Sequence, residues 1–229
     1  VEEIAEKLYH ENQLHLLAGC AGFAAVLPKL LSLNGGKPKM PEFSAKFLVV
    51  CGSVNPITQA QLNYAEEHGF VRIRFTPEQK LLEGYFETVQ GCETLRCWNE
   101  ICQHHARCIL DTNDSQEQPD TPEYAKTAGI LPEEMRMRIS TNLGSAIKKL
   151  IKMGVDSTLL ITGGDSLLAF MNQIAVYEII PICELAPGAV LSRFQIEGKT
   201  YEVISKSGGF GDENLMELLA DEILEKKRR

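Results

Sequence analysis

The sequence has 229 residues, of which 44% are hydrophobic and 24% are charged, a balance typical of globular proteins that excludes disordered and fibrous chains. Its 31 acidic and 23 basic side chains give a formal net charge of −8, so a surface for nucleic acid or anionic lipid is not expected. No run of about 18 apolar residues predicts a membrane span, and the first residues lack the pattern of a secretory signal.

Two further features concern the origin of the chain. The seven cysteines are an odd number, which favours a reducing compartment, the cytoplasm, over a disulfide scaffold. The chain begins at Val1 and not with methionine, so we expect it to be part of a longer protein.

Short aliphatic runs alternate with helical patterns, which predicts an α/β fold of three layers: a largely parallel sheet flanked by helices, with a C-terminal β-hairpin. Residues 2–11 are predicted to form a helix. The apolar run 14–18 ends at a glycine turn, which opens a second helix over 23–31. Residues 34–41 have turn chemistry throughout and predict a linker.

The next predicted element is a buried strand over residues 47–51. Asn55 as N-cap and Pro56 at the first helical position mark the start of a helix that runs to about Glu67. Alternating residues then predict a strand over 70–75.

The middle of the chain, residues 76–126, shows few clear patterns apart from a strand over 107–111 and a polar loop over 112–121. After it we expect a long helix over 132–152 and a central strand over 159–162 that leads into another helix.

The C-terminal part is expected to contain strands over 178–183, 191–196 and 201–205, the last two joined in a hairpin at Glu197-Gly198-Lys199. A closing amphipathic helix begins near Asp212. Its inward residues are expected to be Leu215, Leu218, Leu219, Ile223 and Leu224.

Four apolar runs end in a glycine-containing turn that precedes a helix, at residues 18–22, 51–55, 162–166 and 206–211. In a parallel sheet such turns lie together at the carboxyl ends of the strands, where ligands bind. Glycine lets the backbone approach a ligand closely, and the free N–H groups at a helix start favour phosphate. Each glycine alone is explained by a tight turn, but four junctions together favour a phosphate site.

Two common nucleotide-binding patterns are missing from the sequence. Neither the Walker pattern GxxxxGK[ST] nor the dinucleotide pattern GxGxxG is present. A dehydrogenase-like Rossmann protein would also need an acidic ribose residue about 20 residues further on, which is absent too.

Several segments resemble the carboxyl-terminal, nucleotide-binding domain of the four-carbon acid sugar kinase family. They are residues 160–165, 184–188 and 206–211, together with residues 52–61 and a glycine-rich turn at 17–22. The match covers about residues 14–70 and 130–225, with Cys20 in place of the family's usual small residue. By this resemblance, residues 1–229 form the nucleotide-binding domain, and the amino-terminal substrate domain is missing from the chain.

The resemblance implies an ATP-dependent kinase that phosphorylates the terminal hydroxyl of threonate, erythronate or 3-oxo-tetronate. It implies ATP and Mg²⁺ as cofactors and a sugar acid bound through the missing domain. The chain alone is therefore expected to be inactive, and a homodimer is left open. The residues implied to hold the nucleotide are Ser53, Gly163, Gly164, Asp165, Ser166 and Gly208. A non-catalytic nucleotide-binding or sensing module is the alternative.

Each polar candidate also has a structural interpretation. Asp165 could orient Mg²⁺ or cap the following helix, and Ser53 and Ser166 could donate to phosphates or form turn bonds. Lys206 could place a charge near the phosphates, although a strand-end lysine is more often solvated. Glu184 is interpreted as a turn residue rather than a ribose contact.

Two expectations concern glycine and cysteine chemistry. A valine at Gly164 is expected to crowd a bound phosphate and to resist a positive φ. Cys92, Cys97, Cys102 and Cys108, beside His104 and His105, are five, five and six residues apart, whereas zinc sites space their cysteine pairs by about two to four residues. We therefore expect thiols there and no metal.

Overall fold

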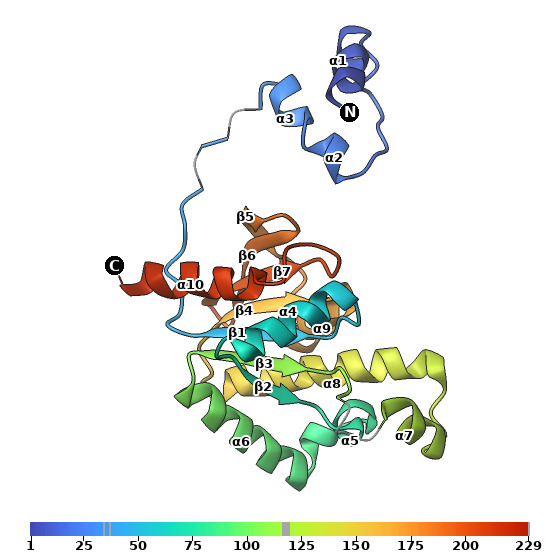
Figure 1. The fold of residues 1–229 in the computed structure, drawn as a ribbon, viewed down its shortest axis with the longest axis vertical. Coiled ribbons are helices and arrows are strands. Elements are labelled where there is room, and N and C mark those ends of the chain that lie inside the picture. The colour runs from blue at the N-terminus through green and yellow to red at the C-terminus, as the bar shows by residue number, and fades with distance from the viewer. Residues whose placement is uncertain (34, 37, 116–119, 229) are drawn as a thin grey trace. The chain divides into compact units, whose positions relative to one another are not determined.

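The computed structural model describes residues 1–33, 35–36, 38–115 and 120–228, and the chain divides into two compact units, Val1–Lys39 and Met40–Arg229. The first unit contains the helices α1 (Glu2–His10), α2 (Ala21–Ala24) and α3 (Leu27–Leu30) (Figure 1). The helix predicted over 2–11 is thus confirmed. The helix predicted over 23–31 is divided, because Pro28 lacks an N–H group and its ring would clash with the carbonyl four residues earlier.

Within the described residues, the second unit is built on one seven-stranded sheet in the order β2-β3-β1-β4-β7-β6-β5. The strands are β1 (Phe47–Cys51), β2 (Val71–Arg74), β3 (Arg107–Asp111), β4 (Thr158–Thr162), β5 (Ile180–Ala186), β6 (Ala189–Ile196) and β7 (Lys199–Lys206). The first five strands in this order are parallel. At the far edge, β6 pairs antiparallel with β7, and β5 pairs antiparallel with β6. The hairpin predicted at residues 197–199 is confirmed. The strand predicted over 178–183 lies slightly later and forms a second hairpin with β6.

Helices cover both faces of the sheet, so the predicted three-layer α/β architecture is confirmed (Figure 1). On one face lie α4 (Pro56–Glu67) and α10 (Leu215–Arg228). On the other face lie α6 (Val89–His104), α8 (Pro132–Lys152) and α9 (Gly164–Ile174). The remaining helices are α5 (Pro77–Leu81), η1 (Tyr85–Glu87) and α7 (Thr121–Thr127).

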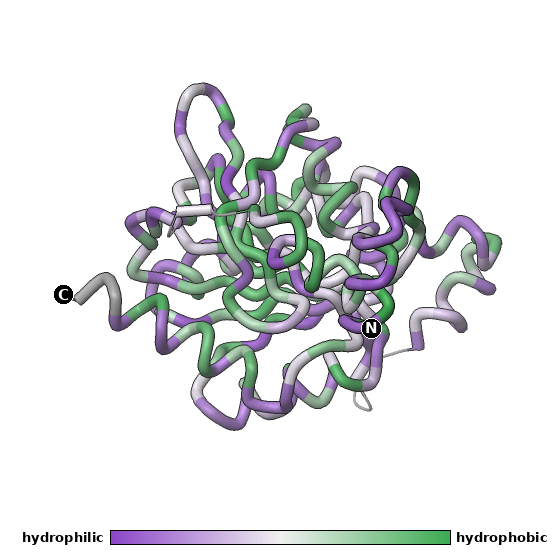
Figure 2. Tube along the Cα trace, turned by 90° about the horizontal axis from the view of Figure 1, so that it is seen from above, coloured by the Kyte–Doolittle hydropathy of each residue, from purple (hydrophilic) through white to green (hydrophobic). Residues whose placement is uncertain are grey.

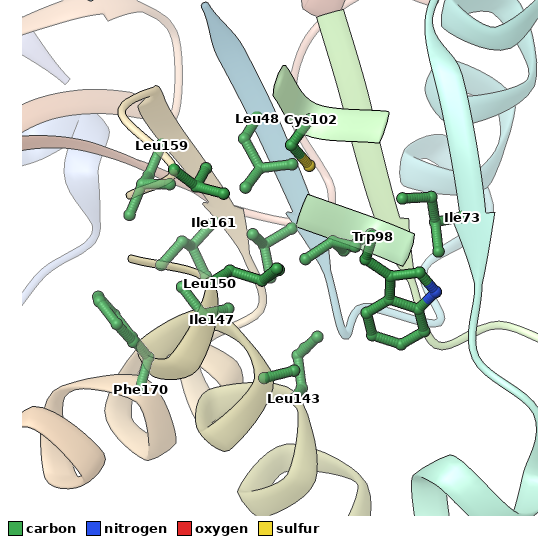
Figure 3. Packing of buried hydrophobic residues seen from close by; sticks show 14 of the residues in the cluster. Leu48, Ile73, Trp98, Cys102, Leu143, Ile147, Leu150, Leu159, Ile161 and Phe170 are labelled. Atoms are coloured by element: carbon green, nitrogen blue, oxygen red, sulfur yellow. The ribbon is translucent and has the colours of Figure 1, made fainter. Parts of the chain in front are cut away.

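The larger of the two cores lies beneath α6, α8 and α9. Figure 3 shows Ile147 and Leu150 of α8 beside the sheet residue Ile161, and Trp98 of α6 beside Ile73 of β2, all in the same core. Every residue of β1 and β4 is buried, as expected for parallel strands that are covered on both faces. The central strands therefore form a rigid base for the turns that follow them.

Helix α10 closes the opposite core and largely follows the predicted pattern. Its apolar and polar residues alternate along the segment that leads to the C-terminus (Figure 2). Leu215, Leu219 and Ile223 are buried, but Leu218 is 54% exposed, so the inward prediction is wrong for that residue. Its position lies beyond the edge of the stripe that faces the sheet.

Two helix predictions depend on local signals and are confirmed. Asn55 caps α4, since its Oδ1 accepts the Ile57 backbone N–H at 2.9 Å, and Pro56 is the first helical residue. Helix α8 has the predicted bounds, 132–152. By contrast, the 16-residue helix α6 lies in the segment for which the sequence predicted no element.

A buried lysine on α5 provides a prediction about acid stability. Lys80 Nζ lies 2.5 Å from Asp114 Oδ1 and donates to Thr121 Oγ1 at 3.1 Å. Partial burial raises the pKa of Asp114, but hydrogen bonds from Lys80 and Thr121 outweigh that effect and hold the pKa below its ordinary value. The folded state therefore binds a proton on Asp114 less readily than the unfolded chain, whose aspartate pKa is about 3.9.

This contribution to stability is present above about pH 4 and is lost as the pH falls through the lowered pKa of Asp114. We expect wild type to be more stable than Asp114→Asn at pH 7, and the difference in unfolding free energy to shrink toward pH 3. Urea denaturation of both chains across this range measures it. A difference that stays constant with pH would contradict the prediction.

Candidate functional site

The connections of β1 and β4 create a crevice at the carboxyl ends of these neighbouring strands. The chain leaves β1 for α4 on one face of the sheet and leaves β4 for α9 on the other face. Such a switch point is where ligands bind in open α/β sheets. The turns after β1, β4 and β7 all lie at this edge of the sheet. The predicted position is therefore confirmed for three of the four glycine junctions.

The prediction is wrong for the fourth junction, residues 18–22. Residues 14–20 form no strand, so this glycine turn does not follow the end of one. It belongs to the first compact unit, in which the described residues form helices and irregular segments only.

A hollow of about 790 Å³ lies between the three turns and α8. Its lining includes all six residues that the sequence singled out, namely Ser53, Gly163, Gly164, Asp165, Ser166 and Gly208. Met135 and Ile139 of α8 add an apolar wall. A second hollow of about 430 Å³ between α8 and α9 shares Arg136, Ser140 and Asp165 with the first.

Glycine permits the turns to approach one another this closely. A Cβ atom on Gly52 would lie 1.9 Å from Ser166 Oγ, and a Cβ atom on Gly208 would lie 2.9 Å from Ser53 Oγ. Both distances are shorter than a van der Waals contact, so a side chain at either position would require the facing serine to shift. The glycines thus bring the three turns onto one hollow.

The two glycines between β4 and α9 differ in conformation. Gly163 has φ +103° and ψ +119°, which residues with a side chain rarely adopt. Gly164 is the first residue of α9, has no positive φ, and a Cβ atom there would meet nothing within 4 Å. A positive φ is therefore not required at Gly164, because the strand bends into the helix one residue earlier, at Gly163.

Backbone N–H groups are the main polar donors of the hollow. No hydrogen bond in the described part of the chain uses the backbone N–H of Ser53, Val54, Gly208 or Gly209. The first N–H groups of α9 lack acceptors within the helix, as at any helix start. Together these groups can donate to one anion from three sides.

The polar side chains of the hollow have distinct environments. Asp165 Oδ2 lies 2.7 Å from Arg136 Nε, and the N-cap of α9 is Gly163, so the capping role predicted as an alternative for Asp165 is wrong. Ser53 Oγ accepts the Asn55 backbone N–H at 3.3 Å, a turn bond that leaves its own O–H free to donate. The Ser166 side chain is buried beside Gly52.

The structure contradicts the expectation for Lys206 and supports the one for Glu184. Lys206 is only 3% exposed, so the expectation of a solvated strand-end lysine is wrong, and burial lowers the pKa of its amine. Glu184 Oε1 accepts the Gly188 backbone N–H at 2.9 Å, which supports its interpretation as a turn residue.

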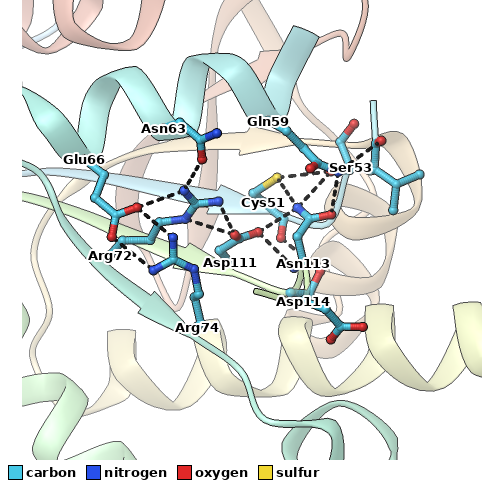
Figure 4. Close-up of polar contacts among 12 residues, drawn as sticks. Cys51, Ser53, Gln59, Asn63, Glu66, Arg72, Arg74, Asp111, Asn113 and Asp114 are labelled. Carbon is cyan, nitrogen blue, oxygen red and sulfur yellow. Dashed lines mark hydrogen bonds and ion pairs between the residues drawn. The ribbon is translucent and has the colours of Figure 1, made fainter. Parts of the chain in front are cut away.

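A network at the end of β3 supports the turn after β1 and was not predicted from the sequence (Figure 4). Asn113 Nδ2 donates to the Ser53 carbonyl at 3.1 Å and to Asp111 Oδ1 at 2.7 Å. Arg72 Nη2 in turn donates to Asp111 Oδ2 at 2.6 Å. Because carbonyl and N–H point in opposite directions across a trans peptide, this contact directs the Val54 N–H away from Asn113.

The signal for this network was present in the sequence, since Asp111 ends a buried strand and Thr112 and Asn113 directly follow it.

In the cysteine segment, Cys92 and Cys97 are exposed, whereas Cys102 and Cys108 are buried. Within the described residues, no group of three or more histidine, cysteine, aspartate or glutamate side chains is arranged to hold a metal ion. The absence of metal stays a prediction.

Comparison with known proteins shows which family this arrangement represents. Residues 48–216 match the family described as nucleotide-binding C-terminal domain. The chain belongs to this family. The resemblance to the nucleotide-binding domain of the four-carbon acid sugar kinases is therefore confirmed.

A curated relative is 3-oxo-isoapionate kinase from Paraburkholderia graminis, which is 25% identical over 172 residues. The alignment covers 71% of this chain but 36% of that kinase, so the chain spans only about a third of its relative's length.

Solved structures share the fold. A protein from Salmonella typhimurium described as a putative tRNA synthase has a TM-score of 0.67 at 17% identity and covers 97% of this chain and 51% of its own. A citrate-bound protein of unknown function from Bordetella bronchiseptica, described as a domain-swapped dimer, has a TM-score of 0.56 at 17% identity, over 100% of this chain and 51% of its own. Among the described residues, none of the helices has the length and apolar character needed to cross a bilayer.

Proposed function

We propose that this chain is the ATP-binding half of a kinase that phosphorylates a four-carbon acid sugar at its terminal hydroxyl. The observation that carries the proposal is the convergence of three glycine turns, with their unengaged N–H groups, on one hollow at the switch point of the sheet. Membership in a nucleotide-binding family and a relative named as a kinase support it. Threonate, erythronate and 3-oxo-tetronate are the proposed substrates.

The residues of the hollow suit the phosphates of ATP. The turns containing Ser53, Gly163 and Gly208 present backbone donors, and Gly164, Asp165 and Ser166 add the positive end of α9. A protein with a net charge of −8 can hold a nucleotide in this way, because the donors are neutral groups aimed at one place. The apolar wall of Met135 and Ile139 offers a surface for the base.

Asp165 is the proposed group for Mg²⁺, held directly or through water. A carboxylate beside phosphates would repel them unless a cation lay between, and oxygen ligands are what Mg²⁺ prefers. Arg136 forms an ion pair with Asp165, in which the side chains lie 2.7 Å apart with 84% and 57% exposure. When bound, Mg-ATP would supply the phosphoryl group and neutralise charge during its transfer.

The wider organisation is part of the same proposal. Residues 1–229 would form the nucleotide-binding domain, and a separate amino-terminal domain would bind the sugar acid. A cytoplasmic location agrees with seven cysteines that are all free in the structure. A homodimer is compatible with these relatives, of which the Bordetella protein is described as a domain-swapped dimer.

The chain alone is expected to bind Mg-nucleotide but not to phosphorylate a four-carbon sugar acid. Holding both substrates in reacting geometry accounts for about 7–11 kcal/mol of barrier lowering, which a lone nucleotide half cannot provide. The test is calorimetric titration with Mg-ADP, followed by ADP release assays with threonate and erythronate, with and without the substrate domain. Absence of nucleotide binding would refute the proposed function, and turnover by the isolated chain would show that it contains the sugar site.

The alternative is a non-catalytic nucleotide-sensing module. Both candidates bind nucleotide through the same turns, so only the second half of the assay separates them. Turnover restored by adding the substrate domain, fused or in trans, supports the kinase. A chain that binds nucleotide but shows no turnover in the presence of that domain supports the sensing module.

A further inference from the structure

Lys206 ends β7 directly before the turn that lines the hollow. It pairs in register with Thr162 of β4, which pairs in register with Cys51 of β1. Because side chains alternate along a strand, these three lie on the face that also carries Ile204, Leu160 and Val49 in the core beneath α4 and α10. They therefore form one buried layer just below the glycine turns.

No carboxylate among the residues that the structure describes pairs with Lys206. Its Nζ donates to the Ser207 carbonyl at 3.0 Å, and within the described part of the chain it forms no ion pair. An ammonium group has three donors, so two are left without a protein acceptor. Lys80, which is also buried, has the expected arrangement, with Asp114 at 2.5 Å and Thr121 at 3.1 Å. An isolated buried charge is costly, and proteins rarely keep one without a use.

The neighbouring groups do not supply the missing counter-charge. Burial and the nearby Asp111 carboxylate raise the pKa of the Cys51 thiol to about 12, so it is neutral at physiological pH. Thr162 Oγ1 is fully buried and has no hydrogen-bond partner among the described residues. Two adjacent strand ends thus hold unsatisfied polar groups, which calls for an explanation because buried polar groups in native proteins are nearly always paired.

A phosphate ligand would resolve this imbalance. Ser207 follows Lys206, and the next two residues, Gly208 and Gly209, line the hollow. The four-carbon stem of lysine is flexible enough to turn its ammonium group from a carbonyl toward an anion. Backbone N–H groups carry only partial charges, so they leave a polyphosphate incompletely neutralised. Burial lowers the pKa of Lys206 in the empty protein, and an anion nearby would favour its charged form.

We propose that Lys206 supplies a positive charge to the nucleotide phosphates, and that its ammonium group exchanges the Ser207 carbonyl for a phosphate oxygen when nucleotide binds. The proposal rests on the proposed function, since it names a binding residue of the same site. It predicts that the lysine contributes to affinity and not to the stability of the empty chain.

The test compares wild type with Lys206→Met, Lys206→Arg and a control at the other end of β7, Lys199→Met, which removes an exposed partner of Asp156. Calorimetric titration with ADP is expected to show at least tenfold weaker binding for Lys206→Met, partial retention for Lys206→Arg and no change for Lys199→Met. The salt dependence of ADP affinity is also expected to be smaller for Lys206→Met, because one charge is lost. Its thermal midpoint should equal or exceed that of wild type.

The outcomes distinguish a failure of the proposed role of Lys206 from a failure of the proposed function. Unchanged ADP affinity in a folded Lys206→Met chain overturns the role of the lysine and leaves the proposed function standing. Lower stability with an unchanged salt dependence also overturns it, since that combination describes a structural lysine. A wild-type chain that binds neither ADP nor inorganic pyrophosphate overturns the proposed function itself, and the inference with it. Pyrophosphate binding that is lost in Lys206→Met supports the lysine even where ADP does not bind.

Discussion

Replacing Asp111 with alanine is expected to lower the free energy of unfolding by about 3–5 kcal/mol, the range for breaking a buried ion pair. Asp111 is fully buried, and it receives hydrogen bonds from Arg72 Nε at 3.0 Å and Nη2 at 2.6 Å. The Arg72 side chain is only 4% exposed, so the variant leaves a guanidinium in the interior with Glu66 as its remaining carboxylate partner. Asn113 also loses the Asp111 carboxylate, which accepts hydrogen bonds from its Nδ2 and its backbone N–H.

The matched control is Asp221→Ala, which removes the partner of Arg107 in a pair whose side chains are 44% and 26% exposed. Exposed pairs contribute about 0–1 kcal/mol, so this variant should be almost as stable as wild type. Urea denaturation measures both. Equal losses in the two variants would mean that burial does not distinguish the pairs. In the Asp111 variant, ADP affinity should fall as well, because Asn113 loses its shortest side-chain hydrogen bond, at 2.7 Å, and keeps only the longer contacts with Gln59 at 3.3 Å and Cys51 Sγ at 3.6 Å to hold it beneath the Ser53 carbonyl.

A valine at Gly163 is expected to lower the stability of the fold, whereas a valine at Gly164 is expected to leave it unchanged. Gly163 has φ +103°, and forcing a β-branched residue into such a conformation costs about 1–3 kcal/mol. At Gly164 the conformation is not strained and the space is open, so Gly164→Val should keep the stability of wild type. Both variants should lose ADP affinity, the first through distortion of the turn and the second because valine occupies the hollow.

Thermal denaturation and ADP titration of the two chains test this prediction side by side. A folded Gly164→Val chain with unchanged ADP affinity would remove this turn from the binding site. A Gly163→Val chain as stable as wild type would show that the turn relaxes without cost. The comparison is informative because the two positions are adjacent and receive the same side chain.

Much of the fold was predictable because its signals are local. The Asn55-Pro56 pair marks the start of α4, and the periodic pattern over 132–152 marks all of α8. The glycine turns after β1, β4 and β7 were predictable as well, since each follows a short aliphatic run. That they meet at one hollow follows from parallel topology, which the alternation of elements predicted.

What was missed depends on contacts between distant parts of the chain. Thr88 is the N-cap of helix α6, and its Oγ1 accepts the Gly91 N–H at 3.0 Å, but Gly91 weakens the helical pattern. A Cβ atom on Gly91 would lie 2.0 Å from the Tyr85 carbonyl oxygen, so the glycine serves packing against η1 and not the helix itself. The sequence alone does not show that contact.

The burial of Lys206 and the role of Asn113 were missed for related reasons. Lys206 shares its face of β7 with Ile204, and this alternation would have placed it inward, but the charge favoured a solvated interpretation. Asn113 lies in the segment that resembles the kinase family least, and only the register of β3 beside β1 brings it to Ser53. Side chains that act across strands need the register, which composition does not provide.

The turns around the hollow come from places far apart in the chain, from Gly52 near its start to Gly209 near its end. On the ribosome, the first turn therefore emerges long before the last one. An unfinished chain that stops before β7 lacks one wall of the hollow and the edge of the sheet beyond β4. With nucleotide bound as proposed, ligand at 100 times its Kd would add about 2.7 kcal/mol to the finished domain alone. Cellular nucleotide would then protect completed molecules from degradation while leaving nascent and truncated ones exposed to it.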